Sequence, residues 1–147
     1  NLSDPVYNVN SIAAVGVAAH ETGHAIQHNK GYVPMKFRSM LVPVANIGSS
    51  AGPLLAILGL SLSFSFLIDI GLILFFGSVL FYLVTLPVEF NASSRALKTL
   101  KEAGVMNKEE LKGVKKVLGA AAMTYVASAL VSLGNFIRFF LLTKRRD

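Results

Sequence analysis

The chain of 147 residues contains no cysteine and no tryptophan, and only eight of its residues are acidic. Without cysteine there can be no disulfide framework and no thiolate metal site. A metal site in this chain would have to use histidine and carboxylate ligands. Histidine is also scarce, with three residues in all. The position of each histidine and each acid is therefore informative.

Charged residues make up only 15% of the chain, whereas hydrophobic residues make up 53% and the mean hydropathy is +0.58. This composition is too apolar for an ordinary soluble domain of this size. The net charge of +6 would favour nucleic-acid binding in a soluble protein. Here the basic residues flank apolar runs, where they are typical of topology signals in a membrane protein. We expect contacts with membrane lipid and no nucleic-acid partner.

Two apolar runs predict a transmembrane helical hairpin within residues 39–88. Each run approaches the roughly 20 residues that a membrane span needs. We place the two spans at about 41–65 and 69–88, with a turn near Ser63–Asp69. The prolines and glycines that interrupt the entry to the first span are typical of a kink or an interfacial segment.

The segment 89–117 is polar and basic, and it predicts helices at the cytoplasmic surface. Gly104 should end the first of them, and a capping box of Asn107 and Glu110 should begin the next. That helix is amphipathic at first and then wholly apolar, which predicts a third membrane helix over 118–143.

The distribution of lysine and arginine predicts the topology. Seven of these residues lie in the segment 89–117, and none lies in the hairpin turn. The positive-inside rule therefore places residues 1–38 and 89–117 in the cytoplasm. Three full crossings would leave the basic tail outside, so the last segment either crosses with Arg138 snorkelling or lies partly in the interface.

The most specific pattern in the chain is His20-Glu21-Thr22-Gly23-His24, an H-E-x-x-H motif. Asn10 or Ser11 can cap a helix that runs to about Lys30, so the two imidazoles would lie one turn, ~6 Å, apart on one face. That spacing lets both bind one Zn²⁺ while Glu21 reaches the metal-bound water as general base. The alternative is a helix whose histidines face solvent or a polar groove.

A catalytic zinc site usually has a third protein ligand. His28 would lie ~12 Å from His20 along the helix, which is too far for one ion. Asp69 is an acid in an apolar run, the setting used by intramembrane site-two proteases. If the first span crosses the membrane once, however, Asp69 would lie ~30 Å from His20, on the opposite face of the membrane. Glu89 follows the second span on the side of the two histidines, although it could also serve as an acid at a helix N-terminus.

Three blocks of the sequence, at 20–27, 41–49 and 86–96, closely resemble the bacterial family of putative neutral zinc metallopeptidases of the YugP type. That family is distantly similar to the HtpX and CAAX-prenyl-protease group of membrane gluzincins. The resemblance covers nearly the whole chain. It implies His20 and His24 as zinc ligands, Glu21 as catalytic base and Glu89 as third ligand. The larger group usually has Asp where Ser93 stands.

We therefore expect an all-α integral membrane protein in which the zinc-binding helix packs with a transmembrane hairpin and a third, C-terminal membrane helix. Residues 1–147 are expected to form one metallopeptidase domain that is truncated at its N-terminus. The predicted function is zinc-dependent hydrolysis of protein or peptide substrates at the cytoplasmic surface of the bacterial cell membrane. Arg95 is a candidate to steady the oxyanion, or else a partner of a lipid headgroup or carboxylate. The alternatives are a membrane scaffold without catalysis and a site-two-type protease that uses Asp69.

Overall fold

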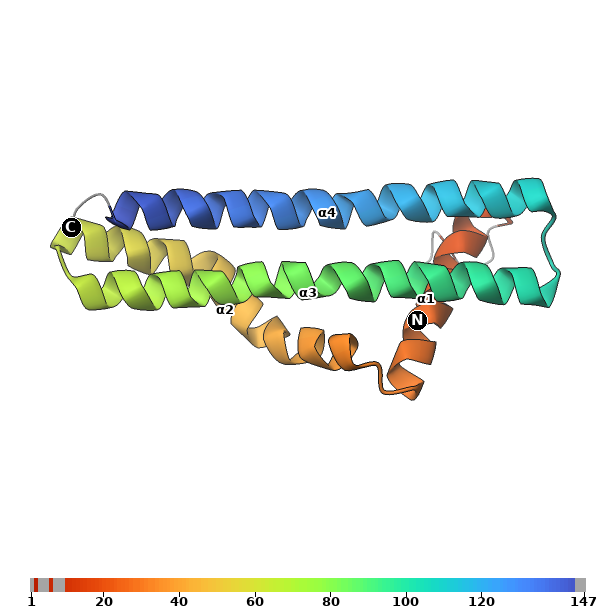
Figure 1. The fold of residues 1–147 in the computed structure, drawn as a ribbon, viewed down its shortest axis with the longest axis horizontal. Coiled ribbons are helices and arrows are strands. Elements are labelled where there is room, and N and C mark those ends of the chain that lie inside the picture. Colours follow the sequence, from red (N-terminus) through yellow and green to blue (C-terminus); the bar gives the residue numbers. More distant parts are fainter. Residues whose placement is uncertain (1, 3–5, 7–9, 145–147) are drawn as a thin grey trace. The chain divides into compact units, whose positions relative to one another are not determined.

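The computed structural model describes residues 2, 6 and 10–144, and in this part of the chain it contains four helices and no strand (Figure 1). The helices are α1 (Ile12–Asn29), α2 (Val33–Leu62), α3 (Ser65–Ala103) and α4 (Lys108–Lys144). The three long helices α2, α3 and α4 are each long and apolar enough to cross a membrane. The prediction of an all-α membrane protein is confirmed. The last residues of the basic tail, 145–147, lie outside the described residues.

The ends of the helices follow from local side chains. Ser11 caps α1, because its hydroxyl oxygen accepts a hydrogen bond of 3.1 Å from the Ala14 amide. Gly104, with φ of +64°, follows the end of α3. The amides of Asn107 and Glu110 each donate to the other residue's side chain, at 2.8 and 2.9 Å. This capping box begins α4 as the sequence predicts.

Two predicted boundaries are wrong. The turn between α2 and α3 is shorter than expected, because α3 already begins at Ser65 and Asp69 lies inside that helix. In addition, α3 continues through Pro87 to Ala103, so Glu89 lies in a helix interior and not at a helix start. A proline removes one backbone hydrogen bond, and the helix continues on either side of this loss.

By its contacts the chain divides into two compact units. Unit 1 comprises Asn1–Met35 and Leu86–Tyr125, and unit 2 comprises Lys36–Thr85 and Val126–Asp147. The helices α3 and α4 therefore contribute one part to each unit. The core of unit 1 is a cluster of apolar side chains from all three of its helical parts, namely Ala19, Ala96, Leu100, Val114 and Leu118.

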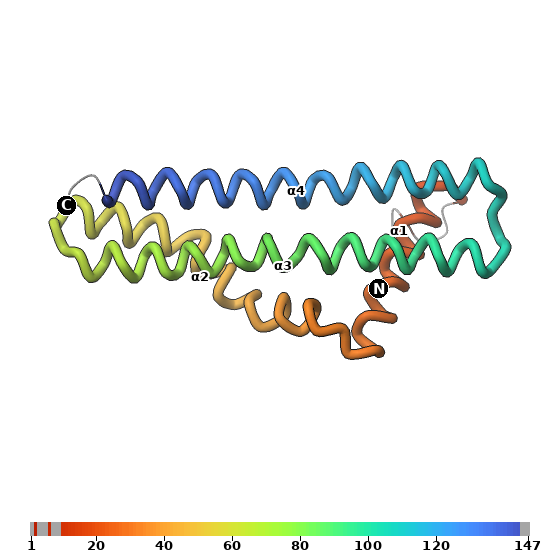
Figure 2. Tube along the Cα trace, viewed as in Figure 1, coloured from red at the N-terminus to blue at the C-terminus, as the bar shows by residue number. Residues whose placement is uncertain are grey.

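In unit 2 the second part of α2 runs beside the first part of α3 (Figure 2). Small residues on α2 allow the two backbones to approach. A Cβ atom added at Gly48 would overlap the carbonyl oxygen of Leu74, and one at Gly52 would lie 2.9 Å from the carbonyl oxygen of Gly71. With Ala56, these glycines form a run of small residues at intervals of four, which is typical of close packing between membrane helices. The glycines that the sequence predicts as interruptions are therefore packing sites.

Candidate metal centre

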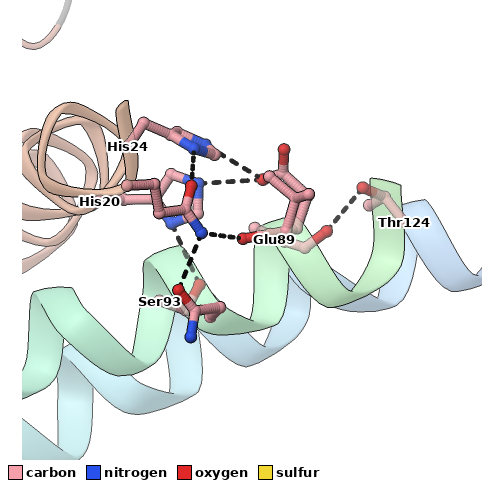
Figure 3. A network of polar contacts seen from close by, with 9 residues as sticks. His20, His24, Glu89, Ser93 and Thr124 are labelled. Atoms are coloured by element: carbon pink, nitrogen blue, oxygen red, sulfur yellow. Dashed lines mark hydrogen bonds and ion pairs between the residues drawn. The ribbon is translucent and has the colours of Figure 1, made fainter. Parts of the chain in front are cut away.

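Two histidines on α1 face the part of α3 that belongs to unit 1. His20 and His24 are one helical turn apart, and their rings meet edge to face with centroids 4.6 Å apart. Figure 3 shows both rings pointing from α1 toward Glu89 on α3. Both histidines are half-buried. Their presence on one face of a regular helix is what the four-residue spacing predicts.

The glycine between the two histidines lets α1 lie this close to α3. Gly23 is buried, and a Cβ atom at this position would overlap the carbonyl oxygen of Ala92. Ala92 is itself fully buried. A larger residue at either position would push the helices apart and carry the imidazoles away from α3.

The third residue of the group is Glu89, whose carboxylate is almost completely buried. Its Oε2 atom lies 3.0 Å from Nε2 of His20 and 3.5 Å from Nε2 of His24. One ligand atom from each of the three residues lies within 4.8 Å of the other two. Ligands about 2.0–2.1 Å from a tetrahedral zinc ion are about 3.3 Å from one another. The donor set and its spacing therefore fit Zn²⁺.

Gln27 determines the tautomer of His24. Its carboxamide nitrogen donates to the backbone carbonyl of Val88 at 2.8 Å and to the side-chain oxygen of Asn91 at 3.0 Å. Since both N–H groups are used, its carboxamide oxygen faces Nδ1 of His24 at 2.9 Å and must accept a hydrogen bond from it. Nε2 of His24 then keeps its lone pair free for a metal ion.

His20 also has a hydrogen-bond partner at Nδ1. Its Nδ1 atom lies 3.0 Å from the hydroxyl oxygen of Ser93. When the hydroxyl accepts a hydrogen bond from Nδ1, Nε2 of His20 is likewise free to bind a metal ion. Both imidazoles are therefore held at Nδ1 and present Nε2 to Glu89.

The carboxylate of Glu89 raises the pKa of His24 above 6.5, chiefly through the hydrogen bond between them, while partial burial acts in the opposite direction. The hydrogen bond to Gln27 raises it further. Glu89 therefore favours positive charge beside Nε2 of His24. A cation bound between the same atoms would supply that charge in place of a proton.

Arg95 lies at the outer end of the same network. Its Nε atom donates to the side-chain oxygen of Asn91 at 2.8 Å, and its guanidinium group lies 5.9 Å from the centre of the Tyr32 ring. Three hydrogen bonds thus lead from Arg95 through Asn91 and Gln27 to His24. These contacts show Arg95 orienting Asn91. A direct contact with a reacting group stays a prediction.

The other candidate residues lie outside the group of three. Glu21 is exposed on α1, next in the chain to His20. His28 is exposed in the last turn of α1. Asp69 is exposed in unit 2, where it borders a cavity with Lys144. Among the described residues, the one group with metal-ligand spacing consists of His20, His24 and Glu89.

Sequence reasoning missed Gln27 and Asn91. A usable signal was present, because Gln27 stands three residues after His24 and therefore on the same helix face. A fully buried glutamine in a chain with so few polar residues indicates an obligatory hydrogen-bond partner, and here the partner is His24.

The sequence of the chain matches a known family. Residues 1–144 match the family described as putative neutral zinc metallopeptidases. The chain belongs to this family. It is also 50% identical, over 141 residues, to the putative membrane protease YugP of Bacillus subtilis (strain 168). The alignment covers 96% of this chain but 63% of that relative, so the chain spans less than two thirds of the relative's length. No solved structure matches it.

Proposed function

We propose that this family member is a membrane-bound zinc endopeptidase that hydrolyses peptide bonds of protein substrates at the cytoplasmic membrane surface. One observation carries the proposal. Two imidazole Nε2 atoms and one buried carboxylate oxygen converge from α1 and α3 with spacing that fits a zinc ion. His20, His24 and Glu89 would hold the ion. Bound Zn²⁺ would supply a Lewis acid that polarises the peptide carbonyl and acidifies a water molecule.

Glu21 is the general base of the proposed reaction. It is exposed next to His20, whereas Glu89 is buried among the imidazoles. The two carboxylates therefore have different environments and different roles. Glu21 takes a proton from the water whose oxygen attacks the peptide carbonyl carbon. It then gives that proton to the amine that leaves when the C–N bond breaks.

Support for the location comes from the charge pattern. Three helices are apolar enough to cross a membrane. Their connections differ in charge, because seven basic residues lie in the segment 89–117 and the turn between α2 and α3 has none. The positive-inside rule places the segment that contains Glu89 in the cytoplasm. The bacterial relative is described as a membrane protease, which supports a bacterial cell membrane.

Two variants separate catalysis from metal binding. Glu21→Gln should retain stoichiometric zinc and lose peptide hydrolysis by a factor of about 10² or more, since it removes the base and spares the ligands. Glu89→Ala should lose both zinc and activity. Glu102→Gln, which changes an exposed acid on α3, is the matched control and should behave as wild type.

Zinc content and cleavage of an unfolded protein are measured for each variant. Full activity of Glu21→Gln would contradict the proposed mechanism. A wild-type protein that binds no zinc when purified without chelator would support a scaffold instead. Loss of zinc in Asp69→Asn, with zinc retained in Glu89→Ala, would favour the site-two alternative.

A further inference from the structure

Unit 1 contains a cavity of about 120 Å³ that adjoins the group of three ligands. Its boundary on the ligand side includes His20, Glu89 and Ser93. The other lining residues are Val17 of α1 and four residues on one face of α4, namely Leu118, Ala121, Ala122 and Tyr125. The lining is mostly apolar.

The size of the cavity limits what it can hold. An engineered protein cavity of about 150 Å³ binds benzene. A space of 120 Å³ is smaller and partly open, so it suits an aliphatic group of up to leucine size better than the ring of phenylalanine or tryptophan. The apolar lining disfavours a charged or amide side chain, which would lose its hydration without gaining a partner.

The cavity adjoins the place where a substrate would react. His20 and Glu89 line the cavity and also provide two of the three converging atoms. A peptide whose carbonyl group reached an ion held by those atoms would have the side chains of its two flanking residues within a few ångströms of that group. The cavity shares His20 and Glu89 with the ligand group, so it lies within reach of one of these side chains.

We propose that this cavity is a substrate subsite that selects a small or medium aliphatic residue, from alanine to leucine, next to the scissile bond. The inference rests on the proposed peptidase function and adds to it the class of substrate. Ala121, which is exposed, and Ala122, which is buried, both line the cavity with only a methyl group, and their small size leaves the space open. Tyr125 also lines the cavity, and its ring limits the size of the residue that fits.

The test compares three variants of the full chain in detergent with wild type. Each protein digests a library of unfolded peptides, and mass spectrometry identifies the residues on both sides of every cleaved bond. Zinc content is measured in parallel. Wild type should prefer alanine, valine and leucine over phenylalanine at one flanking position, by at least about tenfold in kcat/KM.

Ala121→Leu should fill the cavity. We expect it to keep its zinc and to lose cleavage beside leucine by at least about tenfold relative to cleavage beside glycine or alanine. Ala120→Leu makes the same change at a neighbour that is exposed like Ala121 but does not line the cavity, and it should retain the wild-type preference. Tyr125→Ala should enlarge the space and raise cleavage beside phenylalanine.

The outcomes distinguish this inference from the proposed function. If wild type cleaves without preference at either flanking position, or if zinc-loaded Ala121→Leu cleaves with the wild-type preference, the subsite is overturned and the peptidase stands. If zinc-loaded wild type cleaves no peptide at all, the proposed function fails and the subsite fails with it.

Discussion

Gln27 is the residue on which the orientation of His24 depends. It is the largest side chain in the described part of the chain that is completely buried, and all of its hydrogen-bonding groups are used within the network. A buried amide with this many partners is costly to disturb, because each lost bond leaves another buried group unsatisfied. Gln27 therefore acts on the proposed metal site as a positioning residue, without contacting the metal.

Gln27→Leu should weaken zinc binding by about 10–100-fold, the usual cost of losing an outer partner of a metal-binding histidine. It should also lower the free energy of unfolding by about 1–3 kcal/mol, because the Val88 carbonyl loses its donor. Competition with a coloured chelator measures the affinity, and thermal unfolding in detergent measures the stability. His28→Ala, an exposed change on the same helix, is the control and should alter neither quantity. Unchanged zinc affinity in Gln27→Leu would exclude the positioning role.

A substitution at Ser93 should increase the zinc affinity instead of lowering it. A neutral hydroxyl faces Nδ1 of His20. A charged acceptor makes a hydrogen bond roughly twice as strong as a neutral one and increases the basicity of the ring. Ser93→Asp should therefore raise the zinc affinity by up to about tenfold in the same chelator assay. Ser94→Asp adds the same charge at an exposed neighbour and should have a much smaller effect; equal gains in both variants would mean that only the added charge matters.

The sequence predicts the inner residues of the site better than the outer ones. The structure brings together His20, His24 and Glu89. These three residues could be predicted because the helical period and the returning hairpin both follow from the sequence pattern. Gln27 and Asn91 make contacts that depend on how α1 crosses α3, and no spacing rule gives that crossing. The charge of Arg95 and its place six residues after Glu89 indicate a residue near the site, but its contact with Tyr32 is not predictable from spacing.

The site requires that the helices α1 and α3 lie close together. Gly23 is the point of approach. In an exposed helix, replacing glycine by alanine stabilises by up to about 1 kcal/mol. In this helix the added methyl group would overlap a backbone carbonyl that cannot move independently.

Gly23→Ala should therefore destabilise unit 1 by about 1–3 kcal/mol and reduce zinc binding, since the helices must separate. Thr22→Ala changes the exposed neighbour within the same motif and should retain both properties. Thermal unfolding and zinc titration of the two variants give the comparison. A Gly23→Ala protein as stable as Thr22→Ala, with full zinc affinity, would show that the approach of the helices is not required.

The elements also show where sequence patterns mislead. The caps of α1 and α4 were predicted because capping depends on three or four adjacent residues. The sequence pattern does not predict that α3 continues through Pro87, because a proline usually indicates a helix boundary. A long apolar helix can nevertheless contain a proline. The glycines of α2 were read as interruptions, whereas their partner is α3, a helix that pattern analysis treats separately.

At the scale of the whole molecule, the chain has too few polar residues for an ordinary soluble protein. Two of its three histidines and one of its few acids form the ligand group. Three helices are apolar enough to cross a membrane, and the ligand group lies in unit 1, which contains α1 and one part each of α3 and α4. The family is described as zinc metallopeptidases and the bacterial relative as a membrane protease, in agreement with apolar helices and a group of metal-binding residues in one chain.

The most direct test of the account is the position of zinc in a crystal of the zinc-loaded protein, located by anomalous diffraction at the zinc absorption edge. We predict one peak about 2 Å from Nε2 of His20, Nε2 of His24 and a carboxylate oxygen of Glu89. A peak at another place in the chain, or a zinc ion at the two histidines with Glu89 turned away and a different donor in its position, would contradict the account.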